Sequence, residues 1–302
     1  MKYFYIHPFK PQFFFPEAFK KHKVFLSFFE PYSLKGSVSW FLFRHFWLYR
    51  ICFKKNNIEP FIPEEEIRKV VGFDALMAFN TGTPGPERKI TALGLEKNSY
   101  FFIKFGNTHL AIENVTNEHK VLQQLSHLNF VPKVQGFYIN QNSVILKTDV
   151  LTGERLGNVN INDSIFSCLI QLSKQKNVKN LEEDKSLITV FAHGDFCPWN
   201  MMEKDKKIML FDWEMAGDYP LAYDLFTFIF QTQFLLAPEK SISLTLNESK
   251  KIIDKYFQHF NIYDWSNYLK EFCLIKIKLE TKKGEKGMLS QYNALLNYGE
   301  KT

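Results

Sequence analysis

The stretch HGDFCPWN (193–200), followed ten residues later by LFDWE (210–214), decides how this chain is interpreted. Between the two motifs lies MMEKDKKIM, whose polar middle is typical of a turn and whose ends are apolar. A short antiparallel hairpin centred near Lys206 would place Asn200 opposite Asp212, because paired positions in a hairpin sum to a constant. Both side chains offer oxygen ligands of the kind that Mg²⁺ prefers in proteins.

Asp195 lies five residues before Asn200, on the loop that precedes this hairpin. It would face the metal site without being a ligand, free to accept a proton. A lone HGD is more often a turn whose carboxylate caps the backbone. HGD together with the asparagine, however, is expected by chance in only roughly one such chain in a thousand. The full pattern therefore favours a catalytic carboxylate beside a metal site.

The composition is that of a folded globular protein, with 45% hydrophobic and 23% charged residues among 302. The four cysteines are scattered, without CxxC or Cys/His metal spacing, which favours reduced thiols and a cytoplasmic location. No signal peptide is expected, since prolines and lysines stand where an apolar segment should be. The longest apolar run (37–53) contains Arg44, His45 and Arg50, and is too short and too charged for a good transmembrane helix.

The positive charge is concentrated at the start of the chain. Residues 1–55 hold ten Lys/Arg, only two acidic residues and 19 aromatic residues. Two interpretations are open: peripheral contact with the inner face of an anionic membrane, or extra core in which Phe13–Phe15 and Trp40–Trp47 pack on a neighbouring lobe. Nucleic acid is disfavoured as a partner, because the excess charge is confined to one segment and no recognition motif accompanies it. The oligomeric state is left open.

The order of apolar patterns predicts an α+β chain. Strand-like runs joined by turns cover 72–80, 87–96, 99–106, 134–140 and 142–150, with one helical pattern at 117–128. Beyond 151 the patterns are mainly helical, at 163–175, 221–236 and 247–260. We therefore expect a basic, aromatic-rich extension (1–60), a β-rich lobe (61–148) and a helical lobe (149–302).

HGDFCPWN with LFDWE resembles the catalytic core of the aminoglycoside phosphotransferase and choline kinase family, which has the bilobal protein-kinase-like fold. The resemblance implies a small antiparallel β lobe that binds nucleotide and a larger helical lobe that carries the catalytic residues. It implies Asp195 as the catalytic base, Asn200 and Asp212 as Mg²⁺ ligands, and ATP as the phosphoryl donor.

The resemblance extends upstream. YFFIKFG places Lys104 where the family's lysine holds nucleotide phosphates, and Glu118, expected at the start of the next helix, would pair with it. In NTGTPGPERK, Gly82 and Gly85 fit the loop that covers the phosphates, since glycine permits close backbone approach. The backbone around Asp149–Leu151 resembles the hinge between the lobes that meets adenine.

Two further residues have structural interpretations. His193 either shapes the loop or is a buried histidine that hydrogen-bonds to backbone, and we favour the second. Asp224, in AYDLFTF, matches an aspartate that braces the catalytic loop in the family. We expect that role to be structural rather than chemical.

Two departures from protein kinases bear on the acceptor. Gly194 stands where they have the arginine of H-R-D, and nothing after FDWE resembles an activation segment with A-P-E. Both favour a small-molecule hydroxyl acceptor, such as a sugar, an amino alcohol or an aminoglycoside-like compound. The alternative is a catalytically silent nucleotide-binding regulator on the same scaffold; every expected polar position is filled, which disfavours it.

Overall fold

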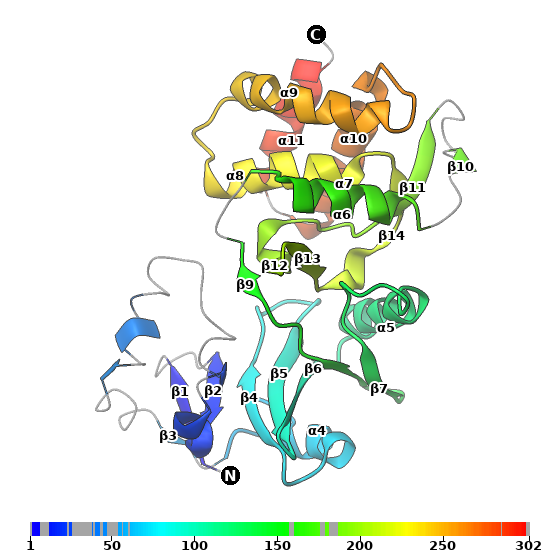
Figure 1. The fold of residues 1–302 in the computed structure, drawn as a ribbon. Helices are drawn as coiled ribbons and strands as arrows, with labels where there is room; N and C mark the ends of the chain where they lie inside the picture. Colours follow the sequence, from blue (N-terminus) through cyan, green and yellow to red (C-terminus); the bar gives the residue numbers. More distant parts are fainter. Residues whose placement is uncertain are drawn as a thin grey trace. The chain divides into compact units, whose positions relative to one another are not determined.

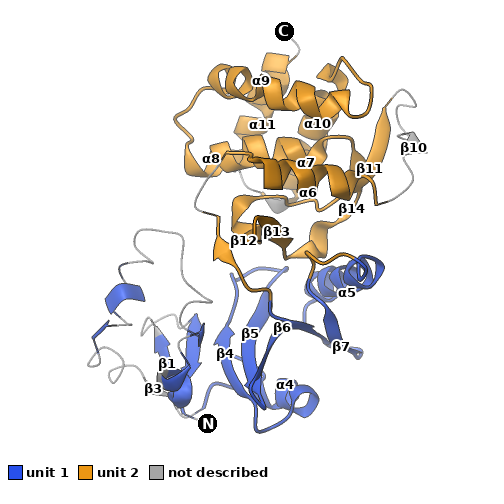
Figure 2. Ribbon diagram, in the orientation of Figure 1, with its two compact units in different colours: residues 1–127, 132–150 blue, residues 128–131, 151–302 orange. Residues whose placement is uncertain are grey.

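The computed structural model shows a chain of two compact units (Figure 2). Unit 1 comprises residues 1–127 and 132–150, and unit 2 comprises residues 128–131 and 151–302. The residues that the structure describes are 2–6, 12–22, 24–25, 38, 40–42, 45–46, 54–55, 57–59, 61–156, 160–175, 179–180, 187–284 and 286–299.

Unit 1 is built on an eight-stranded antiparallel sheet in the order β3-β1-β2-β4-β5-β6-β8-β7 (Figure 1). Its strands are β1 (Tyr3–Ile6), β2 (Phe13–Pro16), β3 (Lys54–Lys55), β4 (Leu76–Asn80), β5 (Lys89–Glu96), β6 (Ser99–Gly106), β7 (Val134–Ile139) and β8 (Val144–Asp149). It also contains the 3₁₀ helix η1 (Glu17–Lys21) and the helices α4 (Glu64–Val71) and α5 (His109–Gln124).

Hydrophobic side chains are buried on both faces of this sheet. Along β4, Met77 and Phe79 belong to one buried cluster and Ala78 to another. Successive residues of a strand point to opposite faces, so the two clusters lie on opposite sides. Ile67 and Val71 of α4 join the cluster of Met77 and Phe79. Helix α4 therefore covers that face.

The predicted hairpins of this unit are present. β5 and β6 are joined by the two-residue turn Lys97–Asn98, whose positive φ angles of 46° and 69° suit the twist of a hairpin. Helix α5, however, begins at His109 rather than near 117, because the side chain of Thr108 caps it by accepting from the Ala111 amide at 3.2 Å. Glu118 therefore lies in the middle of the helix, and the expectation that it stands at the start was wrong.

The strands from the first 55 residues extend the sheet. β2 pairs with β4 through Phe13–Asn80 and Phe14–Phe79. Phe14, Phe15 and Trp40 belong to the two buried clusters. These three side chains therefore pack as the extra-core interpretation expects. Phe41 and Phe46 are exposed, and Trp47 lies outside the described residues.

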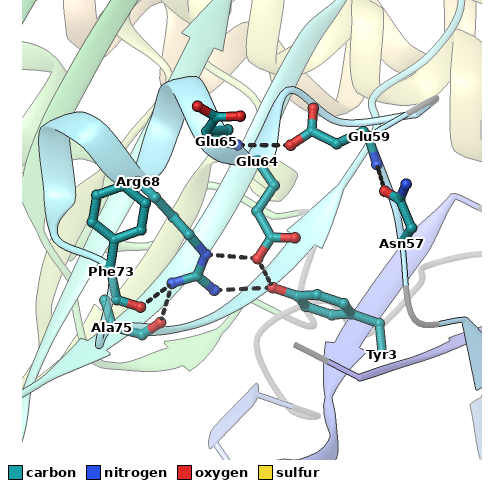
Figure 3. A network of polar contacts seen from close by, with 8 residues as sticks. All are labelled: Tyr3, Asn57, Glu59, Glu64, Glu65, Arg68, Phe73 and Ala75. Carbon is teal, nitrogen blue, oxygen red and sulfur yellow. Dashed lines mark hydrogen bonds and ion pairs between the residues drawn. The ribbon is translucent and has the colours of Figure 1, made fainter.

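A network of hydrogen bonds and an ion pair links β1 to α4 (Figure 3). The Tyr3 hydroxyl donates to Glu64 Oε1 at 2.5 Å and accepts from Arg68 Nη2 at 3.1 Å. Arg68 also donates to Glu64 Oε1 at 2.6 Å and to the carbonyl oxygens of Phe73 and Ala75 at 2.7 and 3.0 Å. Burial first, and then the Glu64 carboxylate, raise the pKa of Tyr3. The hydroxyl therefore stays protonated as a donor.

Unit 2 is mainly helical and holds two three-stranded sheets, β10-β11-β14 and β13-β12-β9. The strands are β9 (Glu154–Arg155), β10 (Lys179–Asn180), β11 (Ile188–Ala192), β12 (Met201–Lys204), β13 (Lys207–Leu210) and β14 (Gly217–Pro220). The helices are α6 (Asp163–Ser173), α7 (Tyr223–Phe226), α8 (Thr232–Leu236), α9 (Ile242–Gln258), α10 (Ser266–Lys283) and α11 (Lys286–Gly299), with the short 3₁₀ helices η2 (Pro198–Asn200) and η3 (Trp213–Met215) and a π-helical turn η4 (Thr227–Gln231).

The hairpin between the two motifs exists, with a register one residue away from the expected one. β12 and β13 pair Met201 with Leu210 and Lys204 with Lys207, so the turn consists of Asp205 and Lys206 alone. Asn200 is therefore opposite Phe211, whose amide donates to the Asn200 carbonyl oxygen at 3.1 Å. The expected pairing of Asn200 with Asp212 was wrong, because it assumed a turn centred on one residue instead of a two-residue turn with positive φ angles.

The α+β class is confirmed: a sheet-rich N-terminal part precedes a helical C-terminal part. Among the described residues, no helix has the length and apolar character needed to cross a membrane.

Candidate active site

The loop that follows β11 is anchored through His193. The ring of this buried histidine donates from Nε2 to the Phe211 carbonyl oxygen at 3.0 Å and accepts at Nδ1 from the Asp195 amide at 3.3 Å. Because a carbonyl oxygen only accepts, the hydrogen lies on Nε2. Both ring nitrogens are thus engaged with backbone, as the structural interpretation of His193 expects.

Asp224 supports the same loop from α7. Its two carboxylate oxygens accept from the amides of His193 and Gly194 at 2.7 and 2.9 Å. Burial raises the pKa of Asp224, while His193 and the two amide bonds act to lower it. Asp224 therefore holds the loop by its backbone, and none of these contacts reaches Asp195 directly.

Asp195, the expected base, is held on both carboxylate oxygens. Oδ2 accepts from Asn200 Nδ2 at 2.8 Å, and Oδ1 accepts from Gln231 Nε2 at 2.7 Å. The Cys197 thiol also donates to Oδ1, at 3.6 Å; burial, and then the neighbouring carboxylate, raise the pKa of Cys197 well above its usual range and keep the thiol protonated. Donors thus hold both oxygens of the Asp195 carboxylate in place.

Asp212 follows β13 in a left-handed conformation, with φ 70° and ψ 60°. This conformation is costly for residues other than glycine and is found preferentially at functional sites. The next residue, Trp213, is fully buried, with its ring 4.6 Å from that of His193. Phe211 binds both His193 and Asn200 through its backbone. The two motifs therefore meet within unit 2, with Asp212 directly after their junction.

The donor set here fits Mg²⁺. The Asn200 amide nitrogen faces Asp195, where it also donates to the backbone oxygen at 2.9 Å, so its carbonyl oxygen is left to bind a metal. Asp212 adds a carboxylate. Among the described residues, no group of three or more His, Cys, Asp or Glu side chains could hold a metal ion. Mg²⁺ suits so small a protein contribution, because it keeps waters and takes substrate phosphates as its other ligands.

Unit 1 contains the predicted lysine–glutamate pair. Lys104 on β6 and Glu118 on α5 are 8% and 3% exposed, and Lys104 Nζ lies 2.9 and 2.6 Å from the two carboxylate oxygens. A buried pair of this kind costs much desolvation and adds little stability for its own sake. Its presence is consistent with the phosphate-binding role that the resemblance implies for Lys104.

The glycine loop lies between β4 and β5. Gly82 has φ +70°, and a Cβ there would lie 2.2 Å from the Lys89 carbonyl oxygen, so only glycine fits. Around Gly85, by contrast, no atom lies within 4 Å of an added Cβ. The hydroxyl of Thr108, the N-cap of α5, donates to the Pro86 carbonyl oxygen at 2.5 Å and ties the loop down.

The expected adenine-binding segment lies at the end of β8. The backbone amide of Asp149 donates to the Lys133 carbonyl oxygen at 2.9 Å, and its side chain accepts from the Lys133 amide at 2.6 Å. These groups of Asp149 are therefore engaged inside unit 1. Leu151 is the first residue of this segment in unit 2.

Sequence reasoning missed the groups behind Asp195. Gln231 stands in the apolar run FIFQTQFLL, Lys276 in the alternating IKIK of α10, and Tyr292 on α11. None has a fixed spacing from HGD, so no motif identified them. For Gln231 alone the sequence offered a signal, a polar residue in a largely apolar helical stretch.

Comparison with known proteins shows similarity to phosphotransferases in sequence family and fold. Residues 174–242 match the model of the phosphotransferase enzyme family. Amicoumacin kinase hAmiN, solved with AMP-PNP, Ca²⁺ and Ami, is 14% identical with a TM-score of 0.51, over 80% of this chain and 86% of that chain. A thermostable mutant of aminoglycoside phosphotransferase APH(4)-Ia in its apo form is 9% identical with a TM-score of 0.54, over 79% of this chain and 100% of that chain.

A ternary complex of such an APH(4)-Ia mutant with ADP and hygromycin B gives a TM-score of 0.53 at 9% identity, over 78% of this chain and 97% of that chain. No curated protein sequence matches the chain significantly. At these identities the structural similarity shows the fold. The resemblance seen in the motifs is thus confirmed: over residues 174–242 the chain matches the phosphotransferase enzyme family, within the protein-kinase-like fold of the aminoglycoside and amicoumacin kinases.

Proposed function

We propose that this protein transfers the γ-phosphoryl group of ATP to a hydroxyl group of a small molecule. The observation that carries the proposal is the set of contacts around Asp195 and Asn200. The two side chains are bonded at 2.8 Å, and the same asparagine stands at the hairpin mouth that leads to Asp212. A base, an amide oxygen and a carboxylate thus belong to one local structure of unit 2.

In this proposal Asp195 orients the acceptor hydroxyl and accepts its proton as the bond to phosphorus forms. Asn200 and Asp212 would hold Mg²⁺, which neutralises charge on the nucleotide phosphates when bound. Lys104, which Glu118 holds at 2.6 Å, would bind the phosphates. Gly82 and Gly85 would cover them, and the backbone near Leu151 would meet adenine.

The conformation of the loop supports a small-molecule acceptor. Gly194 has φ +84°, and a Cβ there would lie 2.2 Å from the Met215 carbonyl oxygen. An arginine at this position, as in H-R-D, therefore cannot be accommodated without moving η3. Of the structurally similar kinases named above, amicoumacin kinase hAmiN was solved with Ami and an APH(4)-Ia mutant with hygromycin B. We propose a sugar, an amino alcohol or an aminoglycoside-like compound as acceptor.

The test is a screen of such hydroxyl compounds for ATP consumption with and without Mg²⁺, beside thermal melts with ATP-Mg²⁺. The proposal expects nucleotide-dependent stabilisation and Mg²⁺-dependent ATP consumption with at least one acceptor. Stabilisation without turnover on any acceptor would favour the alternative, a silent nucleotide-binding regulator. No stabilisation by any nucleotide would refute both.

A further inference from the structure

A chain of hydrogen bonds leads from the Asp195 carboxylate into the helical interior of unit 2. Gln231 Nε2 donates to Asp195 Oδ1 at 2.7 Å. On the other side of the same amide, Lys276 Nζ donates to Gln231 Oε1 at 2.8 Å, and the Tyr292 hydroxyl donates to the same oxygen at 3.4 Å. Gln231 thus stands between the candidate base and a buried lysine.

The chemistry of its neighbours fixes the direction of the Gln231 amide. A lysine ammonium group has donors only, so the amide oxygen must face Lys276. The amide nitrogen then faces Asp195, whose ionised carboxylate can only accept. A flipped amide would place N–H against ammonium and oxygen against carboxylate. Lys276 therefore determines that Gln231 offers a donor, and not an acceptor, to Asp195.

The groups behind Gln231 are held firmly by their surroundings. Lys276 is 4% exposed, with its ammonium group 5.1 Å from the Tyr223 ring centre and 5.8 Å from that of Phe272. Tyr292 is fully buried, and burial is the largest cause that raises its pKa, so its hydroxyl remains a donor. Close packing leaves such side chains little freedom to change rotamer.

The backbone at Gln231 is also unusual. Gln231 is the last residue of the π-helical turn η4 (Thr227–Gln231), between α7 and α8. π-Helical turns are rare and occur frequently at functional sites. The insertion changes the direction of side chains relative to a continuous α-helix. In this chain the side chain that ends the turn is the one that reaches the candidate base.

We propose that Gln231 is a positioning residue for the base: held by Lys276 and Tyr292, it fixes the plane of the Asp195 carboxylate. Asn200 holds the other oxygen at 2.8 Å, so the carboxylate is restrained at both ends. The inference rests on the proposed role of Asp195 in phosphoryl transfer. A reacting group that loses its orientation costs roughly 10- to 100-fold in rate, and this is the size of effect we expect.

The contact itself can be tested without an acceptor, by ¹H–¹⁵N spectra of side-chain amides in the full chain. The Gln231 signal is assigned by its loss in Gln231→Met. We expect it to move in both Asp195→Ala and Lys276→Met, while the signal of Gln233, which donates to the Ala237 and Lys240 carbonyl oxygens, stays in place. A Gln231 signal that is unmoved in both variants would overturn the inference.

The catalytic consequence is tested with an acceptor from the screen. Gln231→Met should lower kcat roughly 10- to 100-fold and leave the KM for ATP unchanged. In an Asp195→Ala background the same substitution should lower the residual rate no further, because Gln231 acts through Asp195. Lys276→Met should reproduce the loss of kcat, and the double variant should be no slower than either single variant.

Gln233→Met is the matched control, since it makes the same change two residues away and also removes amide bonds. It should affect stability but not kcat. Equal kcat values for the Gln231 and Gln233 variants would overturn the positioning role. Absence of turnover in the parent protein on every acceptor would refute the proposed function alone, because the amide signals would still decide whether Gln231 is held between Lys276 and Asp195.

Discussion

Gly194 and Asp224 determine the course of the loop 193–200 through steric and hydrogen-bond constraints on its backbone. Gly194 alone allows the backbone to pass the Met215 carbonyl oxygen, and Asp224 accepts from two successive amides of the loop. Together they place Asp195 between Asn200 and Gln231. The glycine of HGD is therefore a steric requirement of this loop.

Gly194→Ala should lower the free energy of unfolding by roughly 2 kcal/mol or more, because it adds a left-handed non-glycine residue and a steric clash. Urea denaturation measures the loss. Gly287→Ala in α11 is the matched control, because no atom lies within 4 Å of the added Cβ. That variant should be unchanged or about 0.5–1 kcal/mol more stable, as alanine favours helix over glycine. A Gly194→Ala variant as stable as the Gly287→Ala variant would contradict the steric account of Gly194.

Lys104→Met should remove ATP-dependent stabilisation in thermal melts, because the phosphates lose their lysine. It should also lower the free energy of unfolding by about 3–5 kcal/mol, since the buried Glu118 carboxylate loses the ammonium group that pairs with it.

The double variant Lys104→Met with Glu118→Gln separates the two effects. It should recover most of the stability, because no buried charge remains, and still show no response to ATP. A double variant stabilised by ATP-Mg²⁺ as strongly as the parent would show that Lys104 does not bind the phosphates.

The sequence identified the residues whose order and spacing are constrained by chemistry. Asp195 and Asn200 stand five residues apart on one loop, and the structure bonds their side chains directly. Gln231 reaches this carboxylate from η4, and Lys276 of α10 binds the other end of the Gln231 amide, at positions that any polar residue could occupy in the sequence. Only the folded arrangement of η4 and α10 brings them together.

At the level of secondary structure, too, the features that depend on neighbouring residues were predicted better than those that depend on residues farther along the chain. The turns of β5–β6 and β12–β13 depend on local chemistry, and both hairpins were predicted from it. The register of β12–β13 was missed by one residue, because a sequence does not show whether Asp205 and Lys206 alone form the turn. The start of α5 was missed because Thr108, its N-cap, lies nine residues before the amphipathic pattern used to predict it.

Tyr3→Phe tests whether the network of Figure 3 holds β1 to α4. Loss of the hydroxyl removes bonds to Glu64 and Arg68, and we expect the free energy of unfolding to fall by about 1–3 kcal/mol. Tyr263, 84% exposed, provides the control: Tyr263→Phe should leave stability unchanged in the same denaturation experiment. A Tyr3 variant as stable as this control would mean that the hydroxyl contributes nothing to the attachment.

Across the whole chain, the first 55 residues are where the sequence left two interpretations open, extra core or membrane contact. The strands support extra core, because β2 pairs with β4 across more than 60 residues of sequence. Pairing over such a distance leaves no local pattern, and the short aromatic strands did not reveal it. β2 also covers the edge of β4, which would otherwise offer unpaired backbone groups to other chains.

Membrane contact through this segment remains a hypothesis with a direct test. Phe41 and Phe46 are more than half exposed, within a segment of high positive charge. If they insert into an anionic bilayer, the full chain should co-sediment with phosphatidylserine-containing vesicles, and Phe41→Ser with Phe46→Ser should reduce this binding while Trp40 stays buried. Equal co-sedimentation of parent and variant, or none with the parent, would remove the hypothesis.

The phosphotransferase account is tested most directly by comparing Asp195→Asn with Asp212→Asn in titrations with ATP, with and without Mg²⁺, beside an assay of ATP consumption. Asp195→Asn keeps the metal ligands and removes the proton acceptor. It should bind ATP-Mg²⁺ nearly as the parent does and lose turnover by roughly 10²–10⁴-fold. Asp212→Asn should weaken the Mg²⁺-dependent part of nucleotide binding. Full turnover in Asp195→Asn, or unchanged Mg²⁺-dependent binding in Asp212→Asn, would contradict the account.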